Sequence, residues 1–394
     1  MEASSRRASF SREQQILSVL LVFIPLTLIA ARAGWASWLQ FFLSVASVVP
    51  LAAFIGLATE SLAERLGGKI GGLLNATFGN APDLLIGVFG VQKGLIPLVK
   101  ATLVGALISN SALIMGICCV VAGLAYGRPA FKRAEAGHHS ILMMLAVAAF
   151  VFSSVGAIVL CGGIQCTSTA HADMIFHASV GIAIVLLLAY AAYVAYGIFG
   201  LVSLAKVEHD GQETRHLRRG DRELSAVWPT WLALLILAGA TGALIPITDI
   251  LTGSVDPVTR VLGWTQVFVG IVIVANAGNA AEAYAAIRFA FTRGGADPAR
   301  EDSGLDLTLG IASASSVQIA TFIAPLIVLY SIFGHRMNLV FSPVELAILL
   351  LLTIIFAYIC QDGESNWLEG AQLLALYAMA AVVFYTLPVD VFAG

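Results

Sequence analysis

Long apolar runs, separated by short segments rich in Gly, Pro and charged residues, fill almost the whole chain. A helix needs about 20 apolar residues to cross the ~30 Å hydrocarbon core of a bilayer, so each run of that length predicts a membrane-spanning helix. Eleven runs are expected, near 15–31, 35–62, 69–92, 95–125, 138–160, 172–204, 228–252, 261–292, 304–333, 343–360 and 366–391. The pattern therefore predicts an all-α polytopic membrane protein with about 11 transmembrane helices.

The composition supports this interpretation. Of the 394 residues, 59% are hydrophobic and only 11% are charged, against about 25% charged residues in soluble domains. The net charge of −3 is spread over short loops, which gives no support to nucleic-acid binding. We therefore expect a lipid bilayer around the protein and no nucleic-acid partner, while the sequence does not indicate an oligomeric state.

The basic residues predict how the helices are oriented. With the N-terminus in the cytoplasm, sixteen Lys and Arg residues fall on the cytoplasmic side and five on the outer side, the bias that the positive-inside rule describes. We expect a bacterial inner-membrane protein with its N-terminus cytoplasmic and its C-terminus outside. Cys161 and Cys166 flank a short segment on the expected outer side, where a disulfide is allowed but not required.

The ten helices after the first divide into two groups of five. The segment Gly79 to Asp83 in the first group corresponds to Gly278 to Glu282 in the second, 199 positions later. Because each group crosses the membrane an odd number of times, the two form an inverted repeat, which places a substrate site near the midplane and permits alternating access. The expected organisation is an N-terminal tail and first helix over 1–34, a first repeat over 35–205, a cytosolic linker over 206–227 and a second repeat over 228–394.

Asp83 and Glu282 each lie inside an apolar run of lipid length. A charged side chain at bilayer depth costs at least ~2.5 kcal/mol, so an intramembrane carboxylate predicts a functional site. Asn80 and Asn279 precede the two acids by three positions and share a helix face with them. The asparagines could ligate an ion, or they could join neighbouring helices by hydrogen bonds.

Small and polar residues surround these carboxylates in both repeats. The glycines before the asparagines, Gly79 and Gly278, allow close helix packing or a local break that frees backbone carbonyls. A second polar patch follows in each repeat, comprising Ser109, Asn110, Ser315, Ser316 and Gln318. Together these groups predict an all-oxygen site, which suits a hard cation such as Ca²⁺ with its 6–8 oxygen ligands, although the serines could also be small residues at a packing face.

Two further acids, Glu60 and Asp249, are expected near the ends of the helices that precede the carboxylate helices. They could guide ions or protons toward the site. A helix-end acid at the lipid interface is the alternative interpretation.

An ordered set of motifs spans nearly the whole chain: Gly56 to Glu60, Gly79 to Asp83, Lys93 to Leu95, Gly105 to Asn110, Gly278 to Glu282, Ser315 to Ala320 and Asp362 to Gly370. This set resembles the Ca²⁺/H⁺ exchanger (cation/proton exchanger) family of the Ca²⁺/cation antiporter superfamily. The resemblance implies eleven helices and two central acids, by position Asp83 and Glu282, that bind Ca²⁺ or protons alternately. Asn80, Asn279, Ser109, Asn110, Ser315, Ser316 and Gln318 would be neighbouring ligands or hydrogen-bond partners. Asp83 departs from the family pattern, which usually has Glu there.

The expected function is secondary active antiport rather than an enzymatic reaction. Ca²⁺, or another cation, would exchange for H⁺ at the two-carboxylate metal site of Asp83 and Glu282, without a cofactor other than the transported ions. Burial favours the protonated form of a carboxylate and a nearby cation favours the ionised form, so protons and cation would compete. The alternatives are a Na⁺/K⁺-type exchanger of the same superfamily, a cation channel, which the inverted repeat disfavours, and an intramembrane aspartyl protease, for which a Gly-x-Gly-Asp element is missing.

Overall fold

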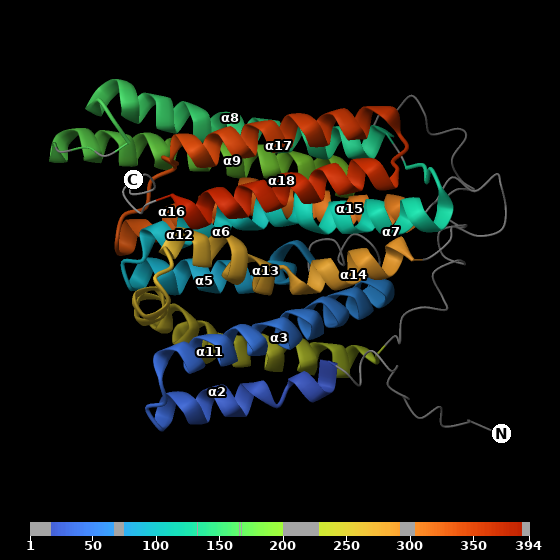
Figure 1. Cartoon of the computed structure of the whole chain (residues 1–394), viewed down its shortest axis with the longest axis horizontal. Helices are drawn as coiled ribbons and strands as arrows, with labels where there is room; N and C mark the ends of the chain where they lie inside the picture. The colour runs from blue at the N-terminus through green and yellow to red at the C-terminus, as the bar shows by residue number, and fades with distance from the viewer. Residues whose placement is uncertain are drawn as a thin grey trace.

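The computed structural model describes residues 17–66, 75–131, 133–164, 166, 168–199, 228–291 and 304–387. Across these ranges the chain forms helices that run along one common direction and pack as a bundle (Figure 1). Extended pairing within the same ranges is limited to one isolated bridge between Ala130 and Glu364. The predicted all-α class is confirmed.

The elements follow one another in two similar series. The first series is α2 (Phe23–Arg32), α3 (Ser37–Leu66), the π-helical η1 (Asn75–Gly79), α5 (Ala81–Gln92), α6 (Ile96–Ile108), the π-helical η2 (Ser109–Ile114), α7 (Met115–Tyr126), α8 (Arg133–Cys161) and α9 (Thr169–Phe199). The second series is α11 (Thr230–Leu262), α12 (Gln266–Phe268), the π-helical η4 (Val269–Val274), α13 (Ala275–Gly278), α14 (Ala280–Ala290), α15 (Gly304–Gln318), the π-helical η5 (Ile319–Ile323), α16 (Ala324–Tyr330), the 3₁₀ turn η6 (Ser331–Phe333), α17 (Pro343–Asp362) and α18 (Trp367–Thr386).

The helices have the length and composition of membrane spans. In the described ranges, eight are long and apolar enough to cross a bilayer, and the bent pair Gln266–Gly278 and Ala280–Ala290 makes a ninth. Two shorter apolar helices, Leu17–Arg32 and Ala81–Gln92, coincide with two further predicted runs. The multi-pass membrane class is confirmed, whereas the count of eleven spans stays a prediction.

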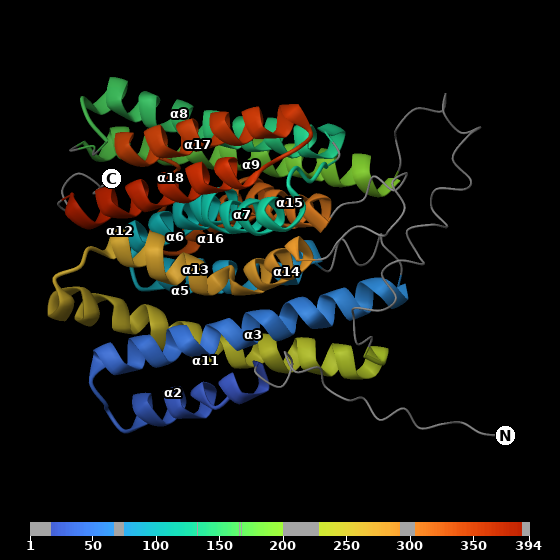
Figure 2. The same ribbon diagram turned by 45° about the vertical axis from the view of Figure 1, so that its right-hand side comes forward.

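The helices of the bundle differ in how deeply they are buried. In both views α2, α3 and α11 form one side and α8, α9 and α17 the opposite side, with α5, α6, α13 and α14 between them (Figures 1 and 2). The span Ile96–Tyr126 is the most enclosed. The peripheral α8 and α9 expose large apolar side chains such as Phe152 and Leu188, which suits contact with lipid.

The two ends of the bundle are distinct. We call the end of the bundle on the right in Figure 1 the near end and the end on the left the far end. At the near end, α3 and α14 finish and α15 begins. At the far end, on the left, α5 is followed by α6 and α11 by α12.

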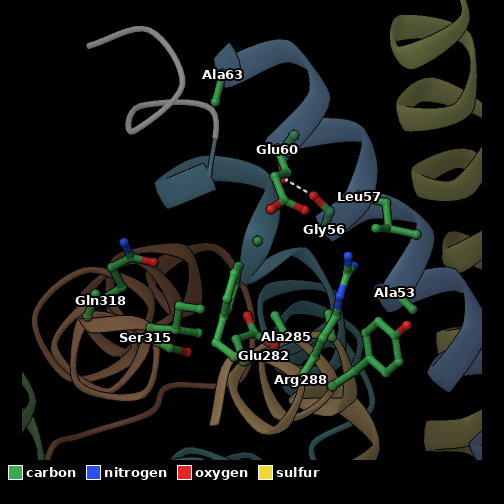
Figure 3. Close-up of a pocket in the computed structure, with 17 residues that line it drawn as sticks. Ala53, Gly56, Leu57, Glu60, Ala63, Glu282, Ala285, Arg288, Ser315 and Gln318 are labelled. Atoms are coloured by element: carbon green, nitrogen blue, oxygen red, sulfur yellow. Dashed lines mark hydrogen bonds between the residues drawn. The ribbon is translucent and has the colours of Figure 1, made fainter. Parts of the chain in front are cut away.

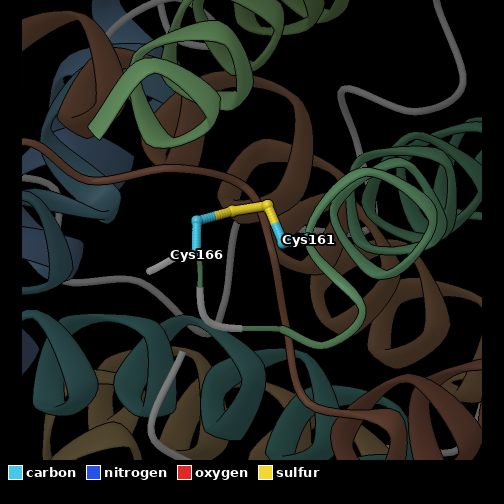
Figure 4. The surroundings of a disulfide bond; sticks show 2 residues. All are labelled: Cys161 and Cys166. Atoms are coloured by element: carbon cyan, nitrogen blue, oxygen red, sulfur yellow. A yellow bond between two sulfur atoms is a disulfide. The ribbon is translucent and has the colours of Figure 1, made fainter. Parts of the chain in front are cut away.

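Cys161, the last residue of α8, forms a disulfide with Cys166 in the connection to α9, with 5.1 Å between their Cα atoms (Figure 4). The pairing that the sequence left open is therefore present.

One helix is longer than its apolar run predicts. The run near 228–252 continues in the structure as α11 to Leu262, through Pro246 and Pro257. It stops where Gly263 takes the left-handed conformation (φ +69°), a common helix end because glycine has no Cβ to strain it. The expectation that Asp249 lies near a helix end was therefore wrong, since it lies well inside α11.

Candidate ion-binding site

Both carboxylate helices begin at an asparagine where the backbone leaves the helical path. Asn80 (φ −95°, ψ 20°) precedes α5, and Asn279 (φ −84°, ψ 11°) precedes α14. The axes of the helical pieces before and after Asn279 differ by 61°. Asp83 and Glu282 each follow in the first turn of the new helix, where the helix dipole favours negative charge.

The carboxylate of Asp83 reaches from the first series of helices into the second. Its side chain is buried and lies against Gly278, where an added Cβ would be 2.7 Å from Asp83 Oδ1. Gly278 thus permits the close approach that its sequence position predicted, and the helix break falls one residue later. Gly278 lies four positions before Glu282, so Asp83 lies against the segment of the second series that carries the other acid.

A chain of hydrogen bonds alternates between the two series. Asn110 Nδ2 donates to Ser315 Oγ at 3.0 Å, and Ser315 Oγ donates to Asn80 Oδ1 at 3.3 Å. Asn80 Nδ2 donates to Gln318 Oε1 at 2.6 Å. Each predicted polar patch therefore binds the opposite series, which brings four of the predicted residues together.

A second group of contacts was not predicted from the sequence. Ser109 Oγ donates to Asn276 Oδ1 at 2.6 Å, and Asn276 Nδ2 donates to the Tyr377 hydroxyl at 2.7 Å. Asn279 Nδ2 donates to the backbone oxygen of Ala106 at 3.3 Å. Asn276 lies three positions before Asn279, and this spacing was the available signal for it. Tyr377 offered no comparable signal.

Four buried side-chain oxygen atoms of the predicted site residues have no hydrogen-bond partner within the described ranges: Asp83 Oδ1, Asn110 Oδ1, Asn279 Oδ1 and Glu282 Oε2. Leaving a buried acceptor unpaired costs about 1–3 kcal/mol. Two come from carboxylates and two from amides, and both series contribute. This donor set fits a hard cation such as Ca²⁺, which accepts oxygen ligands in flexible geometry. Ser316 contacts Ser111 of the first series, with 3.2 Å between their hydroxyl oxygens.

A cavity of about 310 Å³ is lined by Glu282 and by residues toward the near end of the bundle, such as Ala63 and Phe289. It lies between α3, α14 and α15, and its lining includes Gly79, Ser315 and Gln318. Figure 3 shows Glu60 and Glu282 on opposite sides of this cavity. Asp83 is not part of the lining, so of the two central acids only Glu282 faces the open space.

The two acids considered for an ion pathway lie in different places. Glu60 lines the cavity. Asp249 instead pairs with Lys93 at the far end, with 2.7 Å between Asp249 Oδ1 and Lys93 Nζ. The structure therefore does not bring these two acids together.

The fold defines a polytopic helical membrane protein, and the buried oxygens define a candidate cation site between its two series of helices. The model of the sodium/calcium exchanger protein family matches residues 36–199 and again residues 232–386. The chain belongs to this family. The double match corresponds to the two series of elements.

Similar proteins cover almost the whole chain. The Ca²⁺/H⁺ antiporter of Aphanothece halophytica is 35% identical over 379 residues, which is 94% of this chain and 96% of that protein. The Ca²⁺/H⁺ antiporter ChaA of Bacillus subtilis is 34% identical over 367 residues, 92% of this chain and 97% of that protein. The structure of native YfkE superposes with a TM-score of 0.76 at 32% identity, covering 94% of this chain and all of that one.

Proposed function

We propose that the protein is a secondary active antiporter that exchanges Ca²⁺ for H⁺ by alternating access, with Asp83 and Glu282 as its ion-binding carboxylates. The observation that carries this proposal is the set of unpartnered buried oxygens where the two series meet. The relatives that are named Ca²⁺/H⁺ antiporters support the choice of ions. They also favour Ca²⁺/H⁺ exchange over a Na⁺/K⁺-type exchanger, a channel or a protease.

The ionised carboxylates of Asp83 and Glu282 would bind Ca²⁺ together with the amide oxygens of Asn110 and Asn279. Two like charges held close together in a buried site repel each other, and either a cation or protons remove that repulsion. Because both ligands neutralise the same carboxylates, binding of one displaces the other. Asn80, Ser109, Ser315, Ser316 and Gln318 would hold the helices that carry these ligands, and no cofactor beyond the transported ions takes part.

Coupling follows from the cost of charge inside a bilayer. A site with two ionised carboxylates and no cation carries two negative charges, which makes its movement through the low-dielectric interior unfavourable. The Ca²⁺-loaded site and the doubly protonated site are both neutral. Only these two forms would therefore reorient, and this restriction links Ca²⁺ movement in one direction to H⁺ movement in the other.

The proposed arrangement is a first helix in 1–34, a repeat over 35–205, a cytosolic linker over 206–227 and an inverted repeat over 228–394. The linker lies outside the residues that the structure describes. The double family match supports two repeats. In a bacterial inner membrane with a cytoplasmic N-terminus and an outer C-terminus, the near end faces the cytoplasm. Glu60 would then lie on the cytoplasmic ion pathway.

Transport in proteoliposomes with an imposed pH difference tests the proposal. Proton flow down the imposed gradient should drive Ca²⁺ in the opposite direction through the wild-type protein. Asp83→Asn and Glu282→Gln should each lower the transport rate at least about 100-fold, because each removes a charge that balances Ca²⁺. Mn²⁺, Na⁺ and K⁺ assayed in parallel report ion preference.

Asp173→Asn is the matched control, since Asp173 is exposed and pairs with Arg336 away from the site. It should transport at the wild-type rate. Elution volume and thermal unfolding confirm that each variant is folded. Robust Ca²⁺ flux in folded Asp83→Asn or Glu282→Gln would show that these carboxylates do not bind the transported ion.

A further inference from the structure

The helices α3 and α11 share one register. Pro50 lies inside α3 and Pro246 inside α11, and these prolines are separated by 196 positions. The Leu-Gly pairs that begin at Leu66 and Leu262 in the sequence have the same separation. The two helices lie side by side and run in opposite directions along the bundle (Figures 1 and 2). An inverted repeat predicts this relation, so equivalent residues of α3 and α11 should serve opposite ends of the bundle.

This register relates the cavity-lining face of α3 to one face of α11. The α3 residues that line the near-end cavity are Ala53, Gly56, Leu57, Thr59, Glu60 and Ala63. Their equivalents are Asp249, Thr252, Gly253, Val255, Asp256 and Thr259, a set that we call the far-end face. Asp256 is therefore the equivalent of Glu60, a relation that inspection of the apolar runs did not reveal.

Lys93, between α5 and α6, covers the far-end face. Its Nζ lies 2.7 Å from Asp249 Oδ1 and 3.1 Å from Thr252 Oγ1, and it also donates to the backbone oxygen of Asp249. A Cβ added at Gly253 would be 3.1 Å from the same nitrogen. The ammonium thus lies over three residues whose equivalents on α3 line an open cavity.

Asp256 is held by a neighbouring element as well. Gln266, the first residue of α12, donates from Nε2 to Asp256 Oδ1 at 2.6 Å. Both acids of the far-end face are thus bound by groups of the protein. At the near end, by contrast, the equivalent face lines the same cavity as Glu282.

We propose that the far-end face of α11 is the second branch of the ion pathway and that Lys93 closes it. The Lys93 ammonium is a tethered cation on carboxylate, hydroxyl and carbonyl oxygens, which are the groups that would otherwise guide a transported cation. Opening the far end requires Lys93 to leave Asp249 and Thr252, and Gln266 to leave Asp256. That the pathway carries Ca²⁺ rests on the proposed function, whereas the closing contact does not.

Cysteine accessibility in lipid nanodiscs, where reagents reach both ends, tests this proposal. Thr252→Cys reports the far end and Leu57→Cys reports the near-end cavity. Background should be low because Cys118, Cys119 and Cys360 are buried and Cys161 and Cys166 are joined. The reagent is a membrane-impermeant maleimide, and the measured quantity is the labelling rate of each reporter.

Lys93→Gln should raise the labelling rate of Thr252→Cys about fivefold, the population shift expected from loss of a partly exposed ion pair. It should lower the labelling rate of Leu57→Cys, because the two ends open alternately. Gln266→Ala should change both rates in the same directions. Lys93→Arg keeps the positive charge, so both reporters should be labelled at wild-type rates in this variant. Arg336→Gln is the control: it removes a far-end ion pair with Asp173 that does not involve α11, and it should change neither labelling rate.

An unchanged rate at Thr252→Cys in folded Lys93→Gln and Gln266→Ala would overturn the proposal. So would a rise at both reporters, which indicates general loosening rather than alternation. Labelling requires no transport, so the two proposals fail separately. Absence of Ca²⁺ flux driven by a pH difference counts against the proposed function, and absence of the reciprocal labelling change counts against the gate.

Discussion

At the scale of single residues, the site depends on how closely Asp83 approaches a backbone from the other half of the chain. Gly278 leaves no side chain in the way of Asp83 Oδ1. The sequence predicted that both residues matter, because a glycine stood beside a buried acid in each repeat. Which glycine accepts which acid depends on packing between the repeats, and no local pattern encodes that.

Gly278→Ala tests this contact. The added Cβ would lie 2.7 Å from Asp83 Oδ1, too close for either group to stay in place, so the carboxylate should shift and Ca²⁺ affinity should fall about tenfold. The concentration dependence of Ca²⁺ transport measures this change. Gly239→Ala, where an added Cβ meets nothing within 4 Å, should leave the affinity unchanged. Equal affinities for the two variants would contradict the assigned contact.

At the scale of elements, glycines set the distance between α6 of the first series and η4 of the second. A Cβ on Gly105 would be 2.7 Å from the Ile271 backbone oxygen and 2.9 Å from Ala275 Cβ. A Cβ on Gly270 would be 2.7 Å from Ala101 Cβ. Small residues at such crossings let helix backbones approach closely in membranes. This crossing lies next to Ser109 and Asn276, so it positions the site.

Gly105→Ala should therefore destabilise the protein. Its Cβ meets backbone rather than a movable side chain, and overpacking of this kind costs about 1–3 kcal/mol. Thermal unfolding in detergent should show a lower midpoint than wild type. Gly242→Ala serves as the control because nothing lies within 4 Å of its added Cβ. A wild-type midpoint for Gly105→Ala would mean that the crossing is looser than the structure indicates.

Much of the element layout could be predicted from the sequence, because hydrophobic runs and the repeated Gly-Asn segment are local signals. The continuation of α11 through Pro257 could not, since composition alone does not reveal that the surrounding helices keep this segment helical. Two groups of side-chain contacts could not be predicted from the sequence either. They are the ion pair of Asp249 with Lys93 and the contacts of Asn276 with Ser109 and Tyr377. These side chains are far apart in sequence, and only packing of the whole bundle brings them together.

At the scale of the whole molecule, the two ends of the bundle are in different states. The near end contains a cavity that Glu282 lines. At the far end, Lys93 and Gln266 bind the acids of the equivalent face. An exchanger that opens its ends alternately is expected to show this asymmetry in any single conformation. The central acids come from opposite halves, so a relative motion of the halves can transfer access between the ends.

The central claim is that Ca²⁺ and protons occupy the same two carboxylates, and Ca²⁺ titration of the purified protein with simultaneous measurement of proton release tests it most directly. The account predicts that Ca²⁺ binding releases protons, that Ca²⁺ affinity falls as pH falls because protons occupy the same oxygens, and that Asp83→Asn with Glu282→Gln abolishes both signals. Ca²⁺ binding that releases no protons at any pH, or that persists in the double variant, would contradict it.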